Sequence, residues 1–178
     1  MNNRTLLAVL AFAVVLCSCQ KEGTRLFEGS YSFKTSGVLY AHQAEPVDSL
    51  YPEDVTIMLA TESGQMDMTP AGEDGRMFLT MNVTGGEIVV YGVSVDGDSV
   101  SIDPDRRNIV FPFPDREDRP FREDSDITVQ AELGVTGSGK RYDNIILFRL
   151  DYTGSFTVDD AEYVIYDSDI DCRAKLNE

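Results

Sequence analysis

The chain has little with which to build a catalytic or metal site of the common kinds. Its 178 residues include no tryptophan, three cysteines and one histidine, His42. A histidine-rich zinc site is excluded by count, and any Ser-His-Asp triad or Cys-His pair would have to use His42. No GxSxG nucleophile motif accompanies that histidine. The sequence therefore predicts a protein that is not an enzyme and needs no cofactor, with His42 at the surface.

Positive charge is also scarce. Fifteen Lys and Arg face 31 Asp and Glu, and the formal net charge at pH 7 is −16. Nucleic-acid binding depends on Lys and Arg placed against phosphates, and anionic membrane surfaces likewise attract basic segments. We therefore expect no nucleic-acid partner, and an acidic, well solvated surface.

Long apolar runs are missing after the N-terminus. Arg4 precedes an apolar stretch from Leu6 to Val15, which is shorter than the roughly 20 residues of a membrane-spanning helix. A positive residue, a short apolar core and small residues at a cleavage site form an export signal. Residues 1–18 are therefore predicted to be a signal peptide.

The signal ends at Leu16-Cys17-Ser18-Cys19, which resembles the lipobox of bacterial lipoproteins. The resemblance implies that Cys19 takes a diacylglycerol, that the bond before it is cut, and that the new amine is acylated. The protein would then be held at the cell envelope, on the outer membrane, by its N-terminal lipid. The next residues, Gln20-Lys21-Glu22, resemble the surface-export signal of Bacteroidota lipoproteins, although Gly23 replaces a second acidic residue. This likeness implies exposure on the cell surface, with the periplasmic face as the alternative.

The remaining chain reads as a tether, residues 19–27, and one domain, residues 28–178. The lipobox resemblance implies that Cys17 leaves with the signal and that Cys19 carries lipid, so Cys172 is expected to have no intramolecular disulfide partner. Stability must come from a packed core. Cys172 itself is either a reactive thiol or a small buried residue on a strand, and the second fate is commoner.

Apolar and polar residues alternate along most of the domain, which predicts half-buried strands, and no segment has a helical period. Irregular regions are expected from His42 to Pro52 and from Pro112 to Asp126. The predicted fold class is all-β: a single antiparallel β-barrel or, nearly as well supported, a β-sandwich. Turn signals are Ser63-Gly64, Glu73-Asp74-Gly75, Gly85-Gly86, Asp96-Gly97-Asp98 and Gly137-Ser138-Gly139.

The opening strand, Phe27-Glu28-Gly29-Ser30-Tyr31, is similar to the Gly-x-Trp start of lipocalin-like barrels, with Tyr31 in the aromatic place. The likeness is compatible with the calycin-like lipoproteins of Bacteroidota, and implies a barrel whose mouth takes a small apolar ligand. The absence of tryptophan departs from the lipocalin pattern. Fold likeness alone does not carry ligand binding to this chain.

Two motifs suggest ligands that their surroundings do not support. Gly134 to Lys140 fits the phosphate-binding pattern GxxxxGK, but Arg141 follows where Ser or Thr is needed, and no helix comes next. We therefore expect a Gly-rich hairpin turn and no nucleotide. Near the C-terminus, Asp167, Asp169, Asp171 and Glu178 take ligand positions of a calcium loop, but that loop also requires a glycine and an exit helix. The alternative is a strand that carries three Asp on its solvent-exposed face and binds no metal.

Three further features bear on function. Asp48-Ser49-Leu50 and Asp98-Ser99-Val100 resemble the O-glycosylation sequon of Bacteroidota, with Ser49 and Ser99 as acceptors.

All methionines after the initiator cluster in one part of the chain, where flexible thioethers suit either a core or an adaptable apolar pocket. Core packing is favoured, because alternating strands must first be packed. The clustered residues are Met58, Met66, Met68, Met77 and Met81.

These observations predict a lipid-anchored binding module of the cell envelope that takes a small apolar ligand or a protein partner. The alternative is an accessory lipoprotein that packs against another envelope component without a small-molecule ligand. An enzyme is the third possibility. A closed apolar cavity would favour the first, an exposed apolar patch or β-edge the second, and a cleft in which His42 or Cys172 meets an oriented carboxylate the third.

Overall fold

The computed structural model describes residues 23–45, 52–113 and 127–178, and nearly all of this part is β-strand. The signal peptide, Cys19 and Ser49 lie outside the described residues. The strands are β1 (Gly29–Gln43), β2 (Asp54–Leu59), β3 (Ser63–Pro70), β4 (Arg76–Val83), β5 (Ile88–Asp96), β6 (Ser99–Phe113), β7 (Ile127–Tyr142), β8 (Ile145–Val158) and β9 (Ala161–Leu176).

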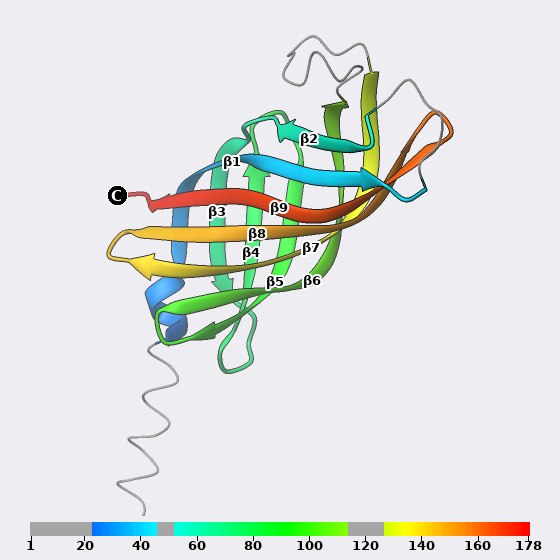
Figure 1. The fold of residues 1–178 in the computed structure, drawn as a ribbon. Coiled ribbons are helices and arrows are strands. Elements are labelled where there is room, and N and C mark those ends of the chain that lie inside the picture. Colours follow the sequence, from blue (N-terminus) through cyan, green and yellow to red (C-terminus); the bar gives the residue numbers. More distant parts are fainter. Residues whose placement is uncertain (1–22, 46–51, 114–126) are drawn as a thin grey trace, which may run out of the picture.

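The strands form a single antiparallel sheet that closes into a ring (Figure 1). From β3 to β9 each strand pairs with the next along the chain, and β9 then pairs with β1. The other edge of β1 has two partners: residues 29–34 pair with β3, and residues 37–42 pair with β2. The prediction of an all-β, single antiparallel domain is confirmed, and the sheet has the closed connectivity of a barrel-like fold.

The ring is fully paired on one side of the molecule and split on the other. β5 pairs with β6 only over Val93–Asp96, so that the later part of β6, Asp105–Phe113, pairs with β7 alone. The register of β6 shifts between Ile102 and Asp105, where the two parts of the strand diverge. β2 lies against this free edge of β6, yet no ladder joins the two strands in the described part of the chain. The split between β2 and β6 holds the candidate site.

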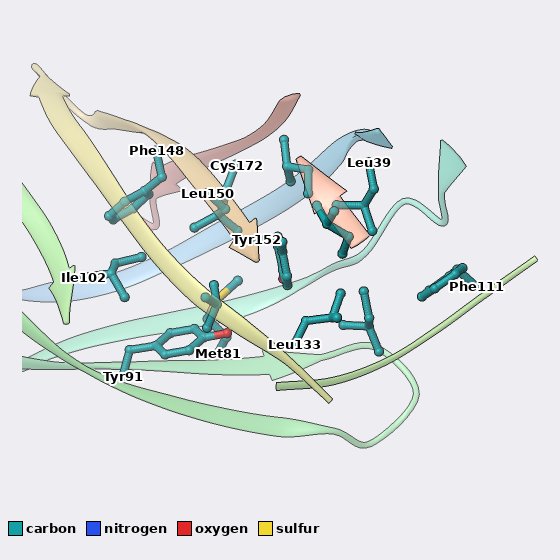
Figure 2. Close-up of a cluster of buried hydrophobic side chains, with 14 of the residues drawn as sticks. Leu39, Met81, Tyr91, Ile102, Phe111, Leu133, Phe148, Leu150, Tyr152 and Cys172 are labelled. Atoms are coloured by element: carbon teal, nitrogen blue, oxygen red, sulfur yellow. The ribbon is translucent and has the colours of Figure 1, made fainter. Parts of the chain in front are cut away.

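Alternation along the strands fills the interior of the ring with one continuous apolar core (Figure 2). In β8, for example, Phe148, Leu150 and Tyr152 are buried, whereas Arg149 and Asp151 between them are exposed. Burying a large apolar side chain stabilises a domain by about 1.5–3 kcal/mol relative to leaving it in water. This packing supplies the stability that no disulfide provides, since Cys172 is free and buried.

Predicted turns are confirmed at three places and wrong at two. Turns do follow β3, β4 and β5 at the expected Gly-containing segments. The prediction at Gly137-Ser138-Gly139 is wrong because these residues lie inside β7, and the chain turns at Asp143-Asn144 instead. A Cβ at Gly137 would lie 2.8 Å from the Arg149 carbonyl oxygen, so this glycine permits a close approach of β8 rather than a turn.

The prediction at Ser63-Gly64 is wrong for the same reason. Both residues belong to β3, and a Cβ at Gly64 would lie 2.0 Å from the Asn82 carbonyl oxygen of β4. Close contact between backbones requires glycine inside a strand, and the composition of a short segment does not distinguish this use from a turn.

The segment expected to be tether ends in a helical turn, Gly23–Phe27, that packs onto the ring. Phe27 is fully buried, and its carbonyl oxygen accepts a 2.8 Å hydrogen bond from the Tyr31 hydroxyl. The packed part of the chain therefore includes Phe27. Of the two expected loops, only the ends are described: β1 extends through His42 to Gln43, and β6 extends to Phe113.

Candidate ligand-binding site

A cavity of about 320 Å³ lies in the split between β2 and β6. Its apolar walls come from Leu59, Ile109 and Val110 on the two free edges, and from Leu150 and Ile170 on β8 and β9 behind them. Small-molecule pockets in proteins begin at about 300 Å³ and are mostly apolar with a few placed polar groups. The cavity therefore has the size and lining of a site for one small ligand.

The polar groups of the cavity gather around Arg107, whose side chain is only 6% exposed. Arg107 lies on the inward face of β6, two residues before the buried Ile109, whereas its neighbour Arg106 points outward to Glu132. A buried guanidinium is costly unless each of its donors finds a partner.

Arg107 is held between two glutamates, and each pairs with it through both carboxylate oxygens. Its Nη1 and Nη2 donate to Glu62 at 3.0 and 2.8 Å. Its Nη2 and Nε donate to Glu87 at 2.6 and 3.5 Å, and Nη1 also reaches the Tyr152 hydroxyl at 3.4 Å. Bidentate pairs of this kind are the stronger charge-assisted hydrogen bonds. The cluster of Glu62, Glu87, Arg107 and Tyr152 is called the Arg107 cluster below.

The Arg107 cluster joins β6 and β8 to two links between other strands. Glu62 lies in the link between β2 and β3, and Glu87 lies in the turn before β5. The Glu62 backbone is fixed to β1 twice: the Thr35 N–H donates to Glu62 O at 2.8 Å, and the Glu62 N–H donates to Thr35 Oγ1 at 3.2 Å. The side chains thus bridge the split where hydrogen bonds between strands are missing.

Electrostatics keep Arg107 charged. Burial alone would lower its pKa, but the hydrogen bonds that Arg107 donates to Glu87 and Glu62 outweigh burial, and the pKa is raised above that of a free arginine. One guanidinium therefore faces two carboxylates, and these three side chains, which are the charged ones lining the cavity within the described ranges, carry one surplus negative charge between them.

Two buried tyrosines feel the charge of Arg107: Tyr152, which belongs to the Arg107 cluster, and Tyr91, and both are seen among the buried side chains of the core (Figure 2). Burial raises the pKa of both Tyr91 and Tyr152, while the charge of Arg107 lowers each by a smaller amount. Tyr91 Oη is buried and has no hydrogen-bond partner among the residues that the structure describes. A buried hydroxyl without a partner costs about 1–3 kcal/mol, so the interior next to the cluster has an unused hydrogen-bonding group.

Cys172 is placed by β9 in the same interior and is 2% exposed. Burial first, and the charge of Glu62 second, raise the pKa of its thiol to about 12. Reactive cysteines need a low pKa and access to solvent, so Cys172 is a packing residue rather than a nucleophile at neutral pH.

Cys172 should make the protein lose stability in mild alkali. Its pKa is about 12 when folded against 9.0 for a free thiol, so from about pH 9 upward the unfolded chain releases a proton that the folded chain keeps. We expect the free energy of unfolding to fall with pH above 9, and to fall less steeply in Cys172→Ala. Urea unfolding of both proteins between pH 7 and 10 measures this, and the buried tyrosines, whose pKa values are also raised, contribute equally to the two proteins. Equal slopes in the two proteins would contradict the assignment.

The methionines divide between the core and the surface. Met66, Met68, Met77 and Met81 are buried in the core, as favoured from the sequence. Met58 is an exception at 55% exposed, because β2 turns Val55 and Ile57 inward.

His42 and the acidic C-terminal residues lie on the outside of the ring. The His42 ring is exposed on β1, with its centroid 5.5 Å from that of Tyr166. Asp167, Asp169 and Asp171 alternate along the exposed face of β9, and Glu178 follows its end. No group of three or more His, Cys, Asp or Glu in the described ranges is arranged to hold a metal ion.

The other motifs also lie away from the cavity. The GxxxxGK segment is part of β7, and Lys140 pairs with Asp98 at 3.1 Å on the surface. Ser99 is exposed at the start of β6, where its hydroxyl donates to Asp98 at 3.1 Å.

The Arg107 cluster was not predicted from the sequence. One signal was present: period-2 alternation places Arg107 on the same face as Ile109, Phe111 and Phe113, and a charged residue there predicts a buried ion pair. Glu62 and Glu87 carried no such signal, since both lie between strands in an acidic chain.

No protein-family model matches this chain, and no curated protein matches its sequence. In the part of the chain that the structure describes, no helix has the length and apolar character needed to cross a bilayer.

Proposed function

We propose that this protein is a non-enzymatic binding module that holds a small, mostly apolar ligand between β2 and β6. The observation that carries the proposal is the cavity itself: apolar residues of four strands contribute to its walls, and the four residues of the Arg107 cluster line one part of it. Sites for small molecules combine such walls with a few polar groups that orient the ligand.

The positions of the reactive residues support binding without catalysis. His42 is exposed on the outer face of β1, and the buried Cys172 holds its proton well above neutral pH. Among the described residues, neither is paired with an oriented carboxylate in the cavity, as nucleophilic or acid–base catalysis would require. The lipobox-like Leu16-Cys17-Ser18-Cys19 supports anchoring of the module to the outer membrane through lipid on Cys19.

The cavity can be tested with N-phenyl-1-naphthylamine, a neutral apolar fluorophore. We expect saturable one-to-one binding to the purified protein, measured by fluorescence. Ala60→Phe places a ring at the cavity wall and should weaken binding at least about tenfold, which corresponds to 1.4 kcal/mol. Ala44→Phe is the matched control, because Ala44 is also an exposed alanine just after a strand and does not line the cavity. Unsaturable binding, or equal binding by the two variants, would contradict the proposal.

A second candidate is the accessory role, which one surface feature favours. Phe78, Ile88 and Val90 are each 47–66% exposed on the outer face of the β4–β5 hairpin, where Val90 lies opposite Thr80. Exposed apolar groups on neighbouring strands are typical of contact surfaces. Failure of the cavity test would leave packing against an envelope component as the better proposal.

A further inference from the structure

The Arg107 guanidinium has no donor left for a ligand. A guanidinium has five N–H donors. In this structure Nη1 donates to Glu62 and Tyr152, Nη2 to Glu62 and Glu87, and Nε to Glu87. An anionic ligand could bind Arg107 only by breaking charge-assisted bonds that a glutamate already makes. The buried arginine is therefore not a receptor for a carboxylate or a phosphate.

The two glutamates, in contrast, can still accept further hydrogen bonds. The two oxygens of a carboxylate offer about four lone-pair sites, and each oxygen of Glu62 and Glu87 accepts one hydrogen bond from Arg107. The Glu62 and Glu87 side chains are 28% and 46% exposed, so their remaining lone pairs are open to a molecule in the cavity. A ligand that donates hydrogen bonds fits this end of the cavity.

Charge selects among such donors. Of the residues that the structure describes, Glu62, Glu87 and Arg107 are the charged ones lining the cavity, and together they carry one surplus negative charge next to apolar walls. An apolar surrounding strengthens the attraction for a cation, and the net charge of −16 on the whole chain acts in the same direction. A neutral hydroxyl would satisfy the lone pairs but not the charge.

We infer that the ligand of this cavity is a small amine, with its ammonium group against Glu62 and Glu87 and its apolar body against Leu59, Ile109 and Leu150. This inference rests on the proposed function and specifies the class of ligand. An ammonium group donates three hydrogen bonds and matches both the acceptors and the surplus charge.

Three probes with the same eight-carbon chain separate the effect of charge from that of apolar burial: octylamine, octanol and octanoate. Titration calorimetry with the whole protein at neutral pH and low salt should rank octylamine at least about tenfold tighter than octanol, and octanoate weakest. The preference for octylamine should shrink as salt is added, because part of the site is open to solvent. The salt series requires no variant.

Glu87→Gln removes the surplus charge and keeps the shape of the side chain. We expect it to lower octylamine affinity about tenfold and to leave octanol affinity nearly unchanged. Glu132→Gln, which removes an exposed partner of Arg106 on the outer face, should change neither. Circular dichroism of each variant checks that the fold is kept, and Glu62→Gln provides a second variant of the same kind.

Each other outcome overturns a distinct claim. Equal affinity for the three probes, or tightest binding of octanoate, overturns the amine inference while the binding function stands. A preference for octylamine that Glu87→Gln and Glu62→Gln both leave intact also overturns it. Absence of binding for all three probes and for N-phenyl-1-naphthylamine means that the proposed function itself is wrong.

Discussion

Arg107→Met is expected to lower the free energy of unfolding by about 2–4 kcal/mol, since it leaves two carboxylates facing each other at a partly buried site. A fully buried pair would lose about 3–5 kcal/mol when one partner is removed, but water screens Glu87, whose side chain is 46% exposed. The loss falls where no strand ladder joins β2 to β6, so few other interactions compensate for it. Urea unfolding of the variant and the parent protein measures the difference.

The neighbouring arginine is the matched control. Arg106 is 74% exposed and pairs with Glu132 at 2.9 Å, so Arg106→Met should change stability by less than about 1 kcal/mol. The triple variant Arg107→Met, Glu62→Gln, Glu87→Gln should recover part of the loss, because it removes the uncompensated charges as well as the guanidinium. Equal destabilisation by the two arginine variants would show that the Arg107 cluster does not stabilise the fold between β2 and β6.

Phe156→Ala is expected to cost about 3–5 kcal/mol, the usual range for removing a buried aromatic ring. Phe156 is 5% exposed and lies stacked on Tyr163 with the centroids 5.4 Å apart. The rings of Phe111 and Phe113 pack against it in T-shaped geometry, with centroids 5.2 and 5.9 Å from that of Phe156. These contacts connect β6, β8 and β9 in the split part of the ring, so the cavity formed by the substitution would open in the core next to the free edge of β6.

Phe78→Ala is the matched control, because it makes the same Phe-to-Ala change at an exposed site. Phe78 is 47% exposed on the outer face of β4, so its removal should change the free energy of unfolding by less than about 1 kcal/mol. Thermal and urea unfolding of both variants give the comparison. Similar losses for the two phenylalanines would mean that the aromatic cluster is not part of the stabilising core.

The fold class was readable from local patterns, but the partners of the strands were not. Alternation identified strands such as β8, because inward and outward side chains follow a period of two regardless of which strand lies alongside. The pairing of β1 with β9 joins the two ends of the domain, and no short segment carries information on such a contact. Glycine was ambiguous for a related reason. Gly137 reads as a turn by composition, but it permits a close approach of β8 that only the folded sheet creates.

The candidate site divides in the same way. Arg107 stands out on an otherwise apolar face of β6, so a buried charge was predictable from the pattern of that strand. Its partners were not, because Glu62 and Glu87 are two of 31 acidic residues and come from separate links in the chain. The methionine cluster shows the opposite case, in which burial of four of the five residues followed from the strand pattern.

The sequence by itself determined that this is an acidic, disulfide-free, all-β domain, because composition and side-chain period act locally along the chain. The tertiary structure alone decided where the ring is split and which glutamates pair with Arg107. These two features together place a cavity, whose described charged residues carry one surplus negative charge, between β2 and β6. The physical reason is that a cavity and an ion pair depend on distances between residues remote in sequence, and only the register of the closed sheet sets those distances.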